Sequence, residues 1–150
     1  MNSKNKKLKI AIAGLGFGKK VHLEALKESD YLTPVAIYHY EKKQKPKLEK
    51  ETGLDFFHDW DDLIKSPEID GIIIATPPES RFKLAKIALE NKKNLLLEKP
   101  VSISSSEIEE LQRISLINNL SVCVDFEYRA VPLSSRQKNL LMKTSWEIYI

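Results

Sequence analysis

The stretch AIAGLGFGKKVH, residues 11–22, decides how the rest of the sequence is interpreted. It reads as the end of an apolar strand, a glycine-rich turn and the start of a helix. Glycines stand at positions 14, 16 and 18, and Lys19 takes the place of the third glycine of a dinucleotide-binding fingerprint. A glycine string is informative only where it joins the first strand of a βαβ unit to the following helix. The neighbouring sequence must show that context.

Outward from this turn, short apolar runs alternate with helical patterns. We expect strands at 8–13, 34–38, 55–57, 69–75, 94–99 and 120–126. We expect helices at 17–29, 44–52, 79–91 and after a cap among serines 104–106, with a turn that Asp59 caps. Strands that are apolar throughout are typical of a sheet with helices on both faces, and crossovers of this length make it parallel. The sequence therefore predicts an α/β fold, a doubly wound parallel sheet (Rossmann fold) in three αβα layers.

The same patterns predict which side chains are buried. Helical spacing places an inward-facing set in two of the helices: Val21, Ala25 and Leu26 in the first, and Ile108, Leu111 and Ile114 in the last. The single cysteine, Cys123, lies between two valines, and we expect it to be a small buried hydrophobe.

Composition excludes several classes of protein. The chain has 150 residues, 42% hydrophobic residues and a net charge of +3, as expected of one globular domain. The lysines of residues 4–9 suit a solvated terminus or a nucleic-acid tail, but no aromatic residues interleave with them to stack bases. The three histidines lack metal-ligand spacing. No apolar run approaches the ~20 residues of a membrane span, and no secretory signal follows the basic start. We expect a cytoplasmic protein without nucleic-acid, membrane or metal partners.

The glycine loop has a specific meaning in such a sheet, because ligands bind at the carboxyl ends of the strands. Gly14 permits a tight turn, and Gly16 lets the backbone approach a pyrophosphate. The helix that begins near Phe17 directs its free N–H groups and positive dipole end at that phosphate. Either Gly18 replaces the third glycine in packing the helix on the strand, or Lys19 points outward beside the phosphates. We expect Gly14, Gly16, Phe17 and Gly18 to form a dinucleotide cradle; a plain turn is the alternative.

The end of the second strand bears on the choice of cofactor. An acid there would hold the ribose 2′-hydroxyl of NAD, but this sequence has Tyr38 and His39 in that slot. Glu41 comes late, and Lys42 and Lys43 follow it. Neutral residues beside two lysines suit a 2′-phosphate, which favours NADP over NAD. In the alternative interpretation the two lysines only solvate a loop.

Three further motifs follow the later strands: Ala75-Thr76-Pro77-Pro78, Glu98-Lys99-Pro100, and Phe126-Glu127-Tyr128-Arg129 with Pro132. Together with the glycine loop and His22, they resemble the Gfo/Idh/MocA family of NAD(P)-dependent oxidoreductases over about residues 8–141. One departure is Arg81, which stands where the family often has a histidine.

The resemblance implies roles for these residues. Thr76 and Pro77 would line the dinucleotide, Glu98 would lie by the nicotinamide ribose, and Arg129 would lie near the same mouth. Lys99 would contact the ring and the substrate hydroxyl. The family acts mainly on sugars, inositols and related polyols.

Chemistry supports a catalytic Lys99 independently. A lysine at a strand's carboxyl end lies in the crevice, and its ammonium can hydrogen-bond a hydroxyl that becomes a carbonyl. A nearby nicotinamide cation would favour its neutral form. The alternative is a lysine that only pairs with Glu98. Pro100 directs the chain here, and its peptide bond is a candidate for the cis form.

These inferences predict the organisation of the chain. We expect a disordered basic N-terminus at 1–7, an NAD(P)-binding Rossmann domain at 8–130, and at 131–150 the start of a linker to an absent substrate domain. Apolar residues in this last segment would favour self-association or a partner chain: Val131, Leu133, Leu140, Leu141 and Trp146.

The expected function is that of the nucleotide-binding domain of an NAD(P)-dependent oxidoreductase, acting on a sugar, polyol or related carbonyl substrate. We expect this piece to be truncated and inactive alone, because catalysis needs the substrate held in place. The alternatives are a stand-alone NAD(P)-binding sensor or regulatory module without catalysis, and a truncated gene product without function.

Overall fold

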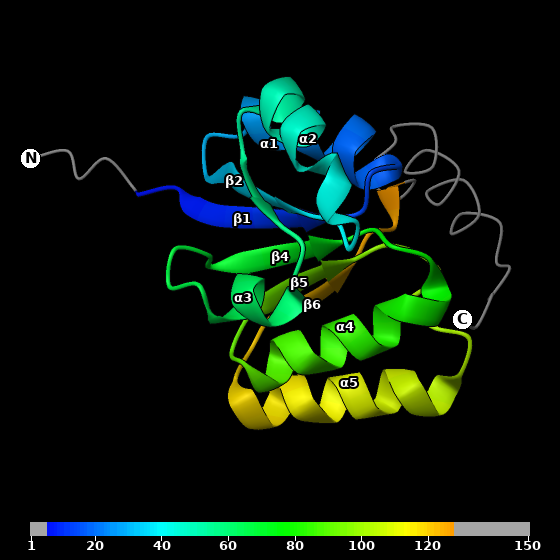
Figure 1. Cartoon of the computed structure of the whole chain (residues 1–150). Coiled ribbons are helices and arrows are strands. Elements are labelled where there is room, and N and C mark those ends of the chain that lie inside the picture. The colour runs from blue at the N-terminus through cyan, green and yellow to red at the C-terminus, as the bar shows by residue number, and fades with distance from the viewer. Residues whose placement is uncertain (1–5, 128–150) are drawn as a thin grey trace, which may run out of the picture.

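The computed structural model describes residues 6–127, which form one parallel sheet flanked by helices (Figure 1). Its strands lie in the order β3-β2-β1-β4-β5-β6, and every neighbouring pair is parallel. Their bounds are β1 Leu8–Ala13, β2 Leu32–Tyr38, β3 Asp55–Phe57, β4 Gly71–Ile74, β5 Asn94–Leu97 and β6 Val122–Val124. This order confirms the predicted Rossmann sheet.

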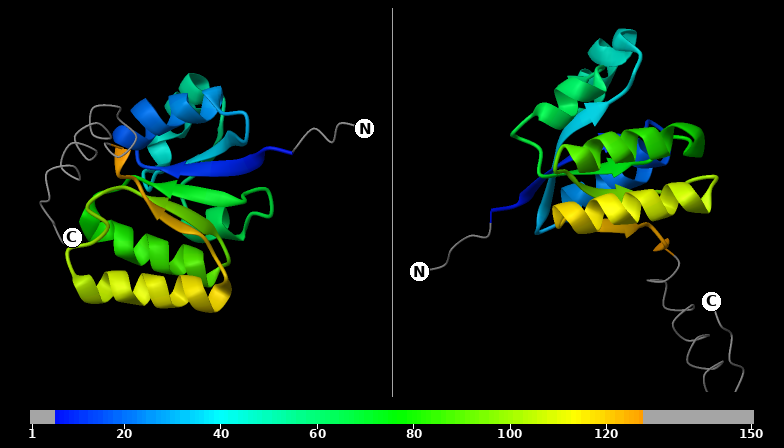
Figure 2. Two further views of the ribbon diagram at one scale, coloured as in Figure 1. Left: turned by 180° about the vertical axis from the view of Figure 1, so that it is seen from behind. Right: turned by 90° about the horizontal axis from the view of Figure 1, so that it is seen from below.

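Helices cover both faces of the sheet. The described elements are η1 Gly18–His22, α1 Leu23–Glu28, η2 Lys42–Gln44, α2 Lys45–Thr52, α3 Trp60–Lys65, α4 Pro78–Glu90 and α5 Ser105–Asn118. Helices α1 and α2 lie over one face, and α3, α4 and α5 lie over the other (Figure 1). Figure 2 shows α4 and α5 side by side from below. The three αβα layers are therefore confirmed. None of the helices within residues 6–127 has the length and apolar character needed to cross a membrane.

Strand β4 shows why the central strands are apolar throughout. Ile72 and Ile74 point into the core beneath α3, α4 and α5, whereas Ile73 points into the core beneath α1. All three side chains are at most 5% exposed. Alternate residues of a strand face opposite sides of the sheet. A strand with helices packed on both faces therefore needs an apolar residue at every position.

The sheet reverses its order of winding between β1 and β4, which places the ligand crevice at their carboxyl ends. The first turn is tightly packed there. Gly14 has a φ of +118°, and a Cβ on it would lie 2.4 Å from the carbonyl oxygen of Ala75. A Cβ on Gly18 would lie 3.0 Å from Ile12 Cγ2 and 3.2 Å from Ala75 Cβ. Gly18 therefore replaces the missing third glycine in packing the helix on the strands.

Lys19 takes no part in that packing. Its ammonium pairs with Glu51 of α2. The structure thus decides between the two interpretations of the altered fingerprint: Gly18 makes the close approach, and Lys19 is directed to the neighbouring helix.

The predicted inward face of the first helix is wrong at two positions. Val21 and Ala25 are exposed, and His22 and Leu23 are buried together with Leu26. The reason is a π-helical turn at η1, in which the N–H of Leu23 donates to the carbonyl of Gly18. A π turn holds one residue more than an α turn, so it shifts the phase of the helix that follows.

Two other burial predictions fail at the outside of the fold. Ile108 is 45% exposed, because it lies at the flank of the buried stripe that contains Leu111 and Ile114. Cys123 is exposed because β6 is an edge strand. Its neighbour Val122 packs against the core beneath α4 and α5, so Cys123 faces the opposite side of the sheet, away from that core.

The helix caps follow the sequence closely. The Asp59 side chain accepts hydrogen bonds from the N–H groups of Asp61 and Asp62 at the start of α3. Gly53 ends α2 with a φ of +69°. Ser104 stands at the N-cap of α5, but its hydroxyl bonds to Ser106 instead of the helix backbone.

The glycine packing generates a stability prediction with a matched control. Gly18→Ala should lower the free energy of unfolding by about 1–3 kcal/mol, because the new methyl group overpacks the contact with Ile12 and Ala75. Gly16→Ala should not destabilise the chain, since a Cβ at Gly16 meets no atom within 4 Å. Urea denaturation followed by circular dichroism measures both. Equal stability of the two variants would contradict the proposed packing role of Gly18.

Candidate functional site

The carboxyl edge of the sheet gathers four segments that are distant in the sequence (Figure 1). They are the glycine loop after β1, the Thr76–Pro77 turn after β4, residues 98–100 after β5 and residues 125–127 after β6. The predicted site residues that follow β1, β4 and β5 therefore share one edge. Arg129 and the apolar residues of 131–146 lie outside the described residues.

The glycine loop leaves room where a phosphate is expected. Gly16 is exposed, and the space that a Cβ would occupy is open. The N–H of Lys20 donates to the Gly16 carbonyl at 3.0 Å, so helical hydrogen bonding starts within the loop. The first N–H groups of a helix have no partner within it and form an anion site with the helix dipole. Phe17 is 43% exposed and lies edge-on to His22. The loop thus has the shape and donors that fit a dinucleotide pyrophosphate.

The end of β2 places Tyr38 and His39 differently. Tyr38 is half-buried and packs edge-on against Trp60 of α3, with ring centroids 4.9 Å apart. Burial, and then the charge of Asp59, raises the pKa of Tyr38. The backbone N–H of His39 bonds to the carbonyl of Phe57, and its ring stacks on Tyr40. The Tyr38 ring is thus held by packing against the core, whereas the His39 ring contacts Tyr40 in the loop after β2.

Glu41 is already engaged by its own loop. Its carboxylate accepts a hydrogen bond from Gln44 at 3.1 Å and lies 3.5 Å from the ammonium of Lys43. The Gln44 bond is the main cause of a lowered Glu41 pKa. This carboxylate stays ionised, but its hydrogen-bonding capacity is partly used before any ribose arrives.

The Thr76–Pro77 turn carries a polar atom that fits a ligand. Thr76 Oγ1 is buried and has no hydrogen-bond partner among the described residues. Pro77 is exposed and immediately precedes α4. Buried hydroxyls nearly always have a partner, so an orphaned hydroxyl at the crevice fits contact with a bound cofactor.

Arg81 ties this turn to the next loop. It is 4% exposed, and its guanidinium donates to the main-chain carbonyls of Thr76, Glu98 and Pro100, the Glu98 bond being 2.5 Å long. Burial is the main cause of a lowered Arg81 pKa. The sequence marked Arg81 only as a departure from the family. Because its acceptors are backbone atoms brought near by the fold, no residue pattern predicted this role.

Lys99 stands in the loop after β5, at the carboxyl edge of the sheet. Its ammonium lies 2.7 Å from Glu127 Oε1, so the alternative in which it pairs only with Glu98 is wrong. Hydrogen bonding to Lys99 is the main cause of a lowered Glu127 pKa. The Lys99–Pro100 bond is cis, as the sequence suggested. Glu127 stood in a recognised motif, but its pairing depends on β5 and β6 lying side by side.

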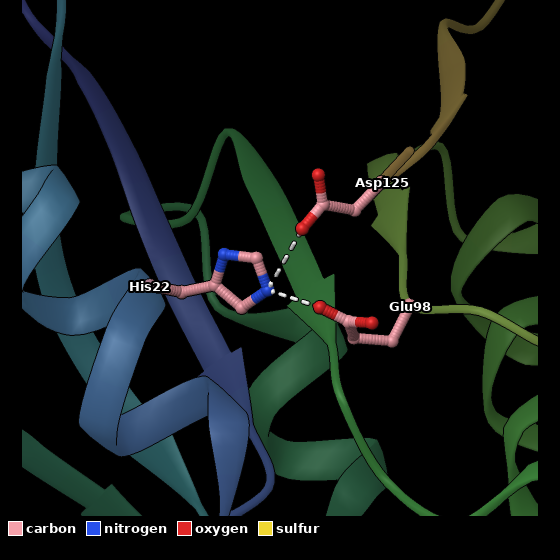
Figure 3. Close-up of side chains that lie close together, drawn as sticks. All are labelled: His22, Glu98 and Asp125. Carbon is pink, nitrogen blue, oxygen red and sulfur yellow. Dashed lines mark hydrogen bonds and ion pairs between the residues drawn. The ribbon is translucent and has the colours of Figure 1, made fainter. Parts of the chain in front are cut away.

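A cluster of three titratable side chains lies beside this lysine (Figure 3). His22 Nε2 is 2.8 Å from Glu98 Oε1 and 3.7 Å from Asp125 Oδ2. His22 and Glu98 are 7% and 8% exposed. Burial, followed by the Glu98 charge, raises the pKa of Asp125. Sequence reasoning missed Asp125, whose only signal was an acidic residue at the end of an apolar strand.

Comparisons with known proteins agree with this geometry. Residues 8–126 match the family model of the oxidoreductase family with an NAD-binding Rossmann fold. The chain is 33% identical over 131 residues to the uncharacterized oxidoreductase sll0816 of Synechocystis, covering 87% of this chain and 35% of that protein. The chain thus spans about a third of the length of this relative.

Solved structures share the fold. Scyllo-inositol dehydrogenase from Lactobacillus casei, with bound NAD(H) and scyllo-inositol, superposes with a TM-score of 0.80 at 26% identity, over 93% of this chain and 42% of that one. The 3-ketoreductase KijD10 from Actinomadura kijaniata, in complex with NADP and TDP-benzene, gives 0.84 at 17% identity, over 93% and 43% of the two chains. With the family match over most of its length, the chain belongs to the Gfo/Idh/MocA oxidoreductase family and carries the family's NAD(P)-binding Rossmann domain.

Proposed function

We propose that the Gly14–Gly18 loop binds the pyrophosphate of NAD(P)(H), and that the chain is the cofactor-binding part of an oxidoreductase acting on a sugar, polyol or related carbonyl. One observation carries the proposal. Gly14 lies too close to the Ala75 carbonyl for a side chain and Gly18 packs tightly against Ile12 and Ala75, whereas Gly16 between them faces open space. This contrast leaves an approachable stretch of backbone at the switch point of the sheet, where dinucleotides bind in this fold.

The other predicted contacts extend from that point along the crevice. Thr76 would offer its unpartnered Oγ1 to the dinucleotide, and Pro77 would pack against it. Glu98 would face the nicotinamide ribose through a carboxylate already oriented by His22 and by the N–H of Lys99. Arg129 is proposed for the same mouth on the resemblance alone.

For the adenosine end we propose a preference for NADP over NAD. The loop after β2 exposes Lys42 and Lys43, and His39 lies at its start. Glu41 accepts a hydrogen bond from Gln44 and forms an ion pair with Lys43, so its carboxylate is less available to bind a ribose 2′-hydroxyl. Tyr38 would contribute through the packing that holds the end of β2.

Lys99 is the proposed catalytic residue. A bound nicotinamide supplies the hydride acceptor or donor. The Lys99 ammonium would hydrogen-bond the substrate oxygen and move a proton at Nζ as a hydroxyl becomes a carbonyl. Glu127, 2.7 Å away, would hold the lysine side chain in the crevice before substrate binds. Arg81 fixes the backbone on both sides of Lys99 through the carbonyls of Glu98 and Pro100.

The proposed substrate class follows the similar inositol dehydrogenase, whose structure holds scyllo-inositol. The chain spans 42% of that protein, and we propose that substrate contacts and full activity require regions beyond the cofactor-binding domain. The competing proposal is a binding module that senses NAD(P)(H) without turnover. It has the same cradle but needs no role for Lys99.

The cradle is tested by a graded change at Gly16. Gly16→Val should abolish binding of NADPH and NADH in calorimetric titration, because its side chain fills the space left for the pyrophosphate. Gly16→Ala should bind with intermediate affinity. Both variants should unfold like the parent chain, since the space at Gly16 is open. Tighter binding of NADPH than of NADH by the parent chain is expected. Unchanged affinity in Gly16→Val would refute the cradle.

Turnover separates the enzyme from the sensor. The parent chain is screened with NAD+ or NADP+ against scyllo-inositol, myo-inositol and simple sugars, with absorbance at the reduced nicotinamide band as readout. Any turnover found should vanish in Lys99→Ala while cofactor affinity persists. Lys83→Ala, at an exposed lysine of α4, is the matched control and should leave turnover unchanged. Turnover by the parent would favour the enzyme over the binding module, and turnover in Lys99→Ala would remove the catalytic role of that residue. Binding without turnover is expected both of the binding module and of a cofactor domain that needs regions beyond it.

A further inference from the structure

Of the cluster of His22, Glu98 and Asp125, the proposed function uses Glu98 and its contact with His22 and leaves Asp125 without a task. It joins the helix that follows the glycine loop to the ends of β5 and β6 (Figure 3). One end therefore adjoins the proposed phosphate site, and the other adjoins the loop that carries Lys99. A charge that changes at one of these places can act on the cluster directly.

The cluster contains more acceptors than donors. His22 presents a single nitrogen, Nε2, to two carboxylates. The 2.8 Å contact goes to Glu98, whose other oxygen accepts the N–H of Lys99 at 3.1 Å. Asp125 Oδ2, at 3.7 Å, lies beyond hydrogen-bond length from the ring. Two neighbouring carboxylates that have one hydrogen-bond donor between them repel each other. A proton held within the group lowers this repulsion most directly.

The geometry favours a proton over a metal ion. Two ligands of one tetrahedral zinc ion, with bonds of about 2.0–2.1 Å, lie about 3.3 Å apart. The 2.8 Å between His22 Nε2 and Glu98 Oε1 is instead the length of a hydrogen bond. The two groups thus hydrogen-bond each other directly.

The groups around the cluster come from each element that faces it. Glu127, two residues after Asp125, adds negative charge and is paired with Lys99. Arg81 of α4 interacts with the Glu98 charge from the other side. From the glycine loop, the uncharged ring of Phe17 lies against the His22 ring. Among the described residues, Glu127 is thus paired with Lys99 and Glu98 faces Arg81, so Asp125 is the least compensated carboxylate of the group.

We propose that His22, Glu98 and Asp125 share a dissociable proton that is released when an oxidised dinucleotide binds and retained when the reduced form binds. The proposal rests on the proposed function, which places the nicotinamide beside Glu98 and Lys99. An oxidised nicotinamide ring is a cation and favours the ionised form of nearby carboxyls, whereas the reduced ring is neutral. An O–H or N–H bond of the cluster dissociates, the proton passes to the buffer, and no electrons are transferred.

This linkage gives the site a means to distinguish the two redox forms. Proton release on binding makes affinity for the oxidised cofactor rise with pH, because binding and deprotonation favour each other. Affinity for the reduced cofactor should change less. The cluster would then hold a proton again once the nicotinamide has become neutral.

Calorimetry counts the protons. The chain is titrated with NADP+ and with NADPH at pH 5.5, 6.5 and 7.5, each in two buffers of different ionisation enthalpy. We expect the difference in protons released between the two forms to reach up to about one per cofactor at its maximum. In Asp125→Asn, which keeps the shape of the side chain, the difference should fall close to zero with binding preserved. Asp61→Asn, on the exposed surface of α3, is the matched control and should behave like the parent.

A measurement without cofactor tests how the charge of Asp125 affects the stability of the fold. Because the pKa of Asp125 is raised in the folded chain, its ionised form destabilises the fold at neutral pH. Asp125→Asn should therefore raise Tm at pH 7, and the gain should vanish as the pH falls towards the unfolded value of about 3.9. An equal Tm of parent and variant at pH 7 would overturn the shared proton. Since His22→Gln risks misfolding at a buried position, Asp125→Asn carries the test.

The outcomes separate this proposal from the function it rests on. If neither cofactor binds, the proposed cradle fails and the linkage fails with it. If both bind with equal proton counts, the cradle stands and the linkage alone is overturned. A rise in Tm with zinc ions that is lost in Asp125→Asn would also overturn it, by making the cluster a metal site.

Discussion

The close approach of the first helix to β1 and β4 is the constraint on which the rest of the structure depends. Gly14 passes the Ala75 carbonyl at a distance that excludes any side chain, and Gly18 sits against Ile12 and the Cβ of Ala75. A side chain at Gly14 would clash with the Ala75 carbonyl, and one at Gly18 would press against Ile12 and Ala75 and strain the contact of the helix with the sheet. The helix would then lose its burial of Leu23 and Leu26, and its amino end would leave the crevice. Packing and ligand binding are thus served by the same two contacts.

A second set of contacts, polar and largely buried, organises the other side of the crevice. Arg81 holds the turn after β4 and the loop after β5 through three carbonyls. His22 holds Glu98 from the opposite side. A buried guanidinium and buried carboxylates are costly unless their hydrogen bonds are satisfied, so each partner limits the freedom of the others. Lys99 lies between these contacts: Arg81 binds the carbonyls on both sides of it, and its ammonium pairs with Glu127.

Local patterns were most reliable where one residue type has one physical use. The continuous apolar runs and the Asp59 cap were predictable, and so was the place of the glycine loop in the first βα unit. Predictions of side-chain burial failed where an irregular turn or the place of a strand in the sheet changed which side chains face the core. The π turn at η1 moved the buried face of the helix from Val21 and Ala25 to His22 and Leu23. Cys123 is exposed because its strand lies at the sheet edge, which no local pattern encodes.

The sequence by itself determined the fold and the segments that meet at the carboxyl edge of the sheet, because hydrophobic periodicity and glycine geometry act over a few neighbouring residues. The family followed from the resemblance of its motifs, which the family match confirmed. Only the tertiary structure decided which side chains meet within that crevice. It paired Lys99 with Glu127, directed Arg81 to three carbonyls, and joined His22 to Glu98 and Asp125. His22 and Glu98 are 76 residues apart along the chain, and Lys99 and Glu127 are 28 apart. Contacts of that range follow from the order of the strands in space.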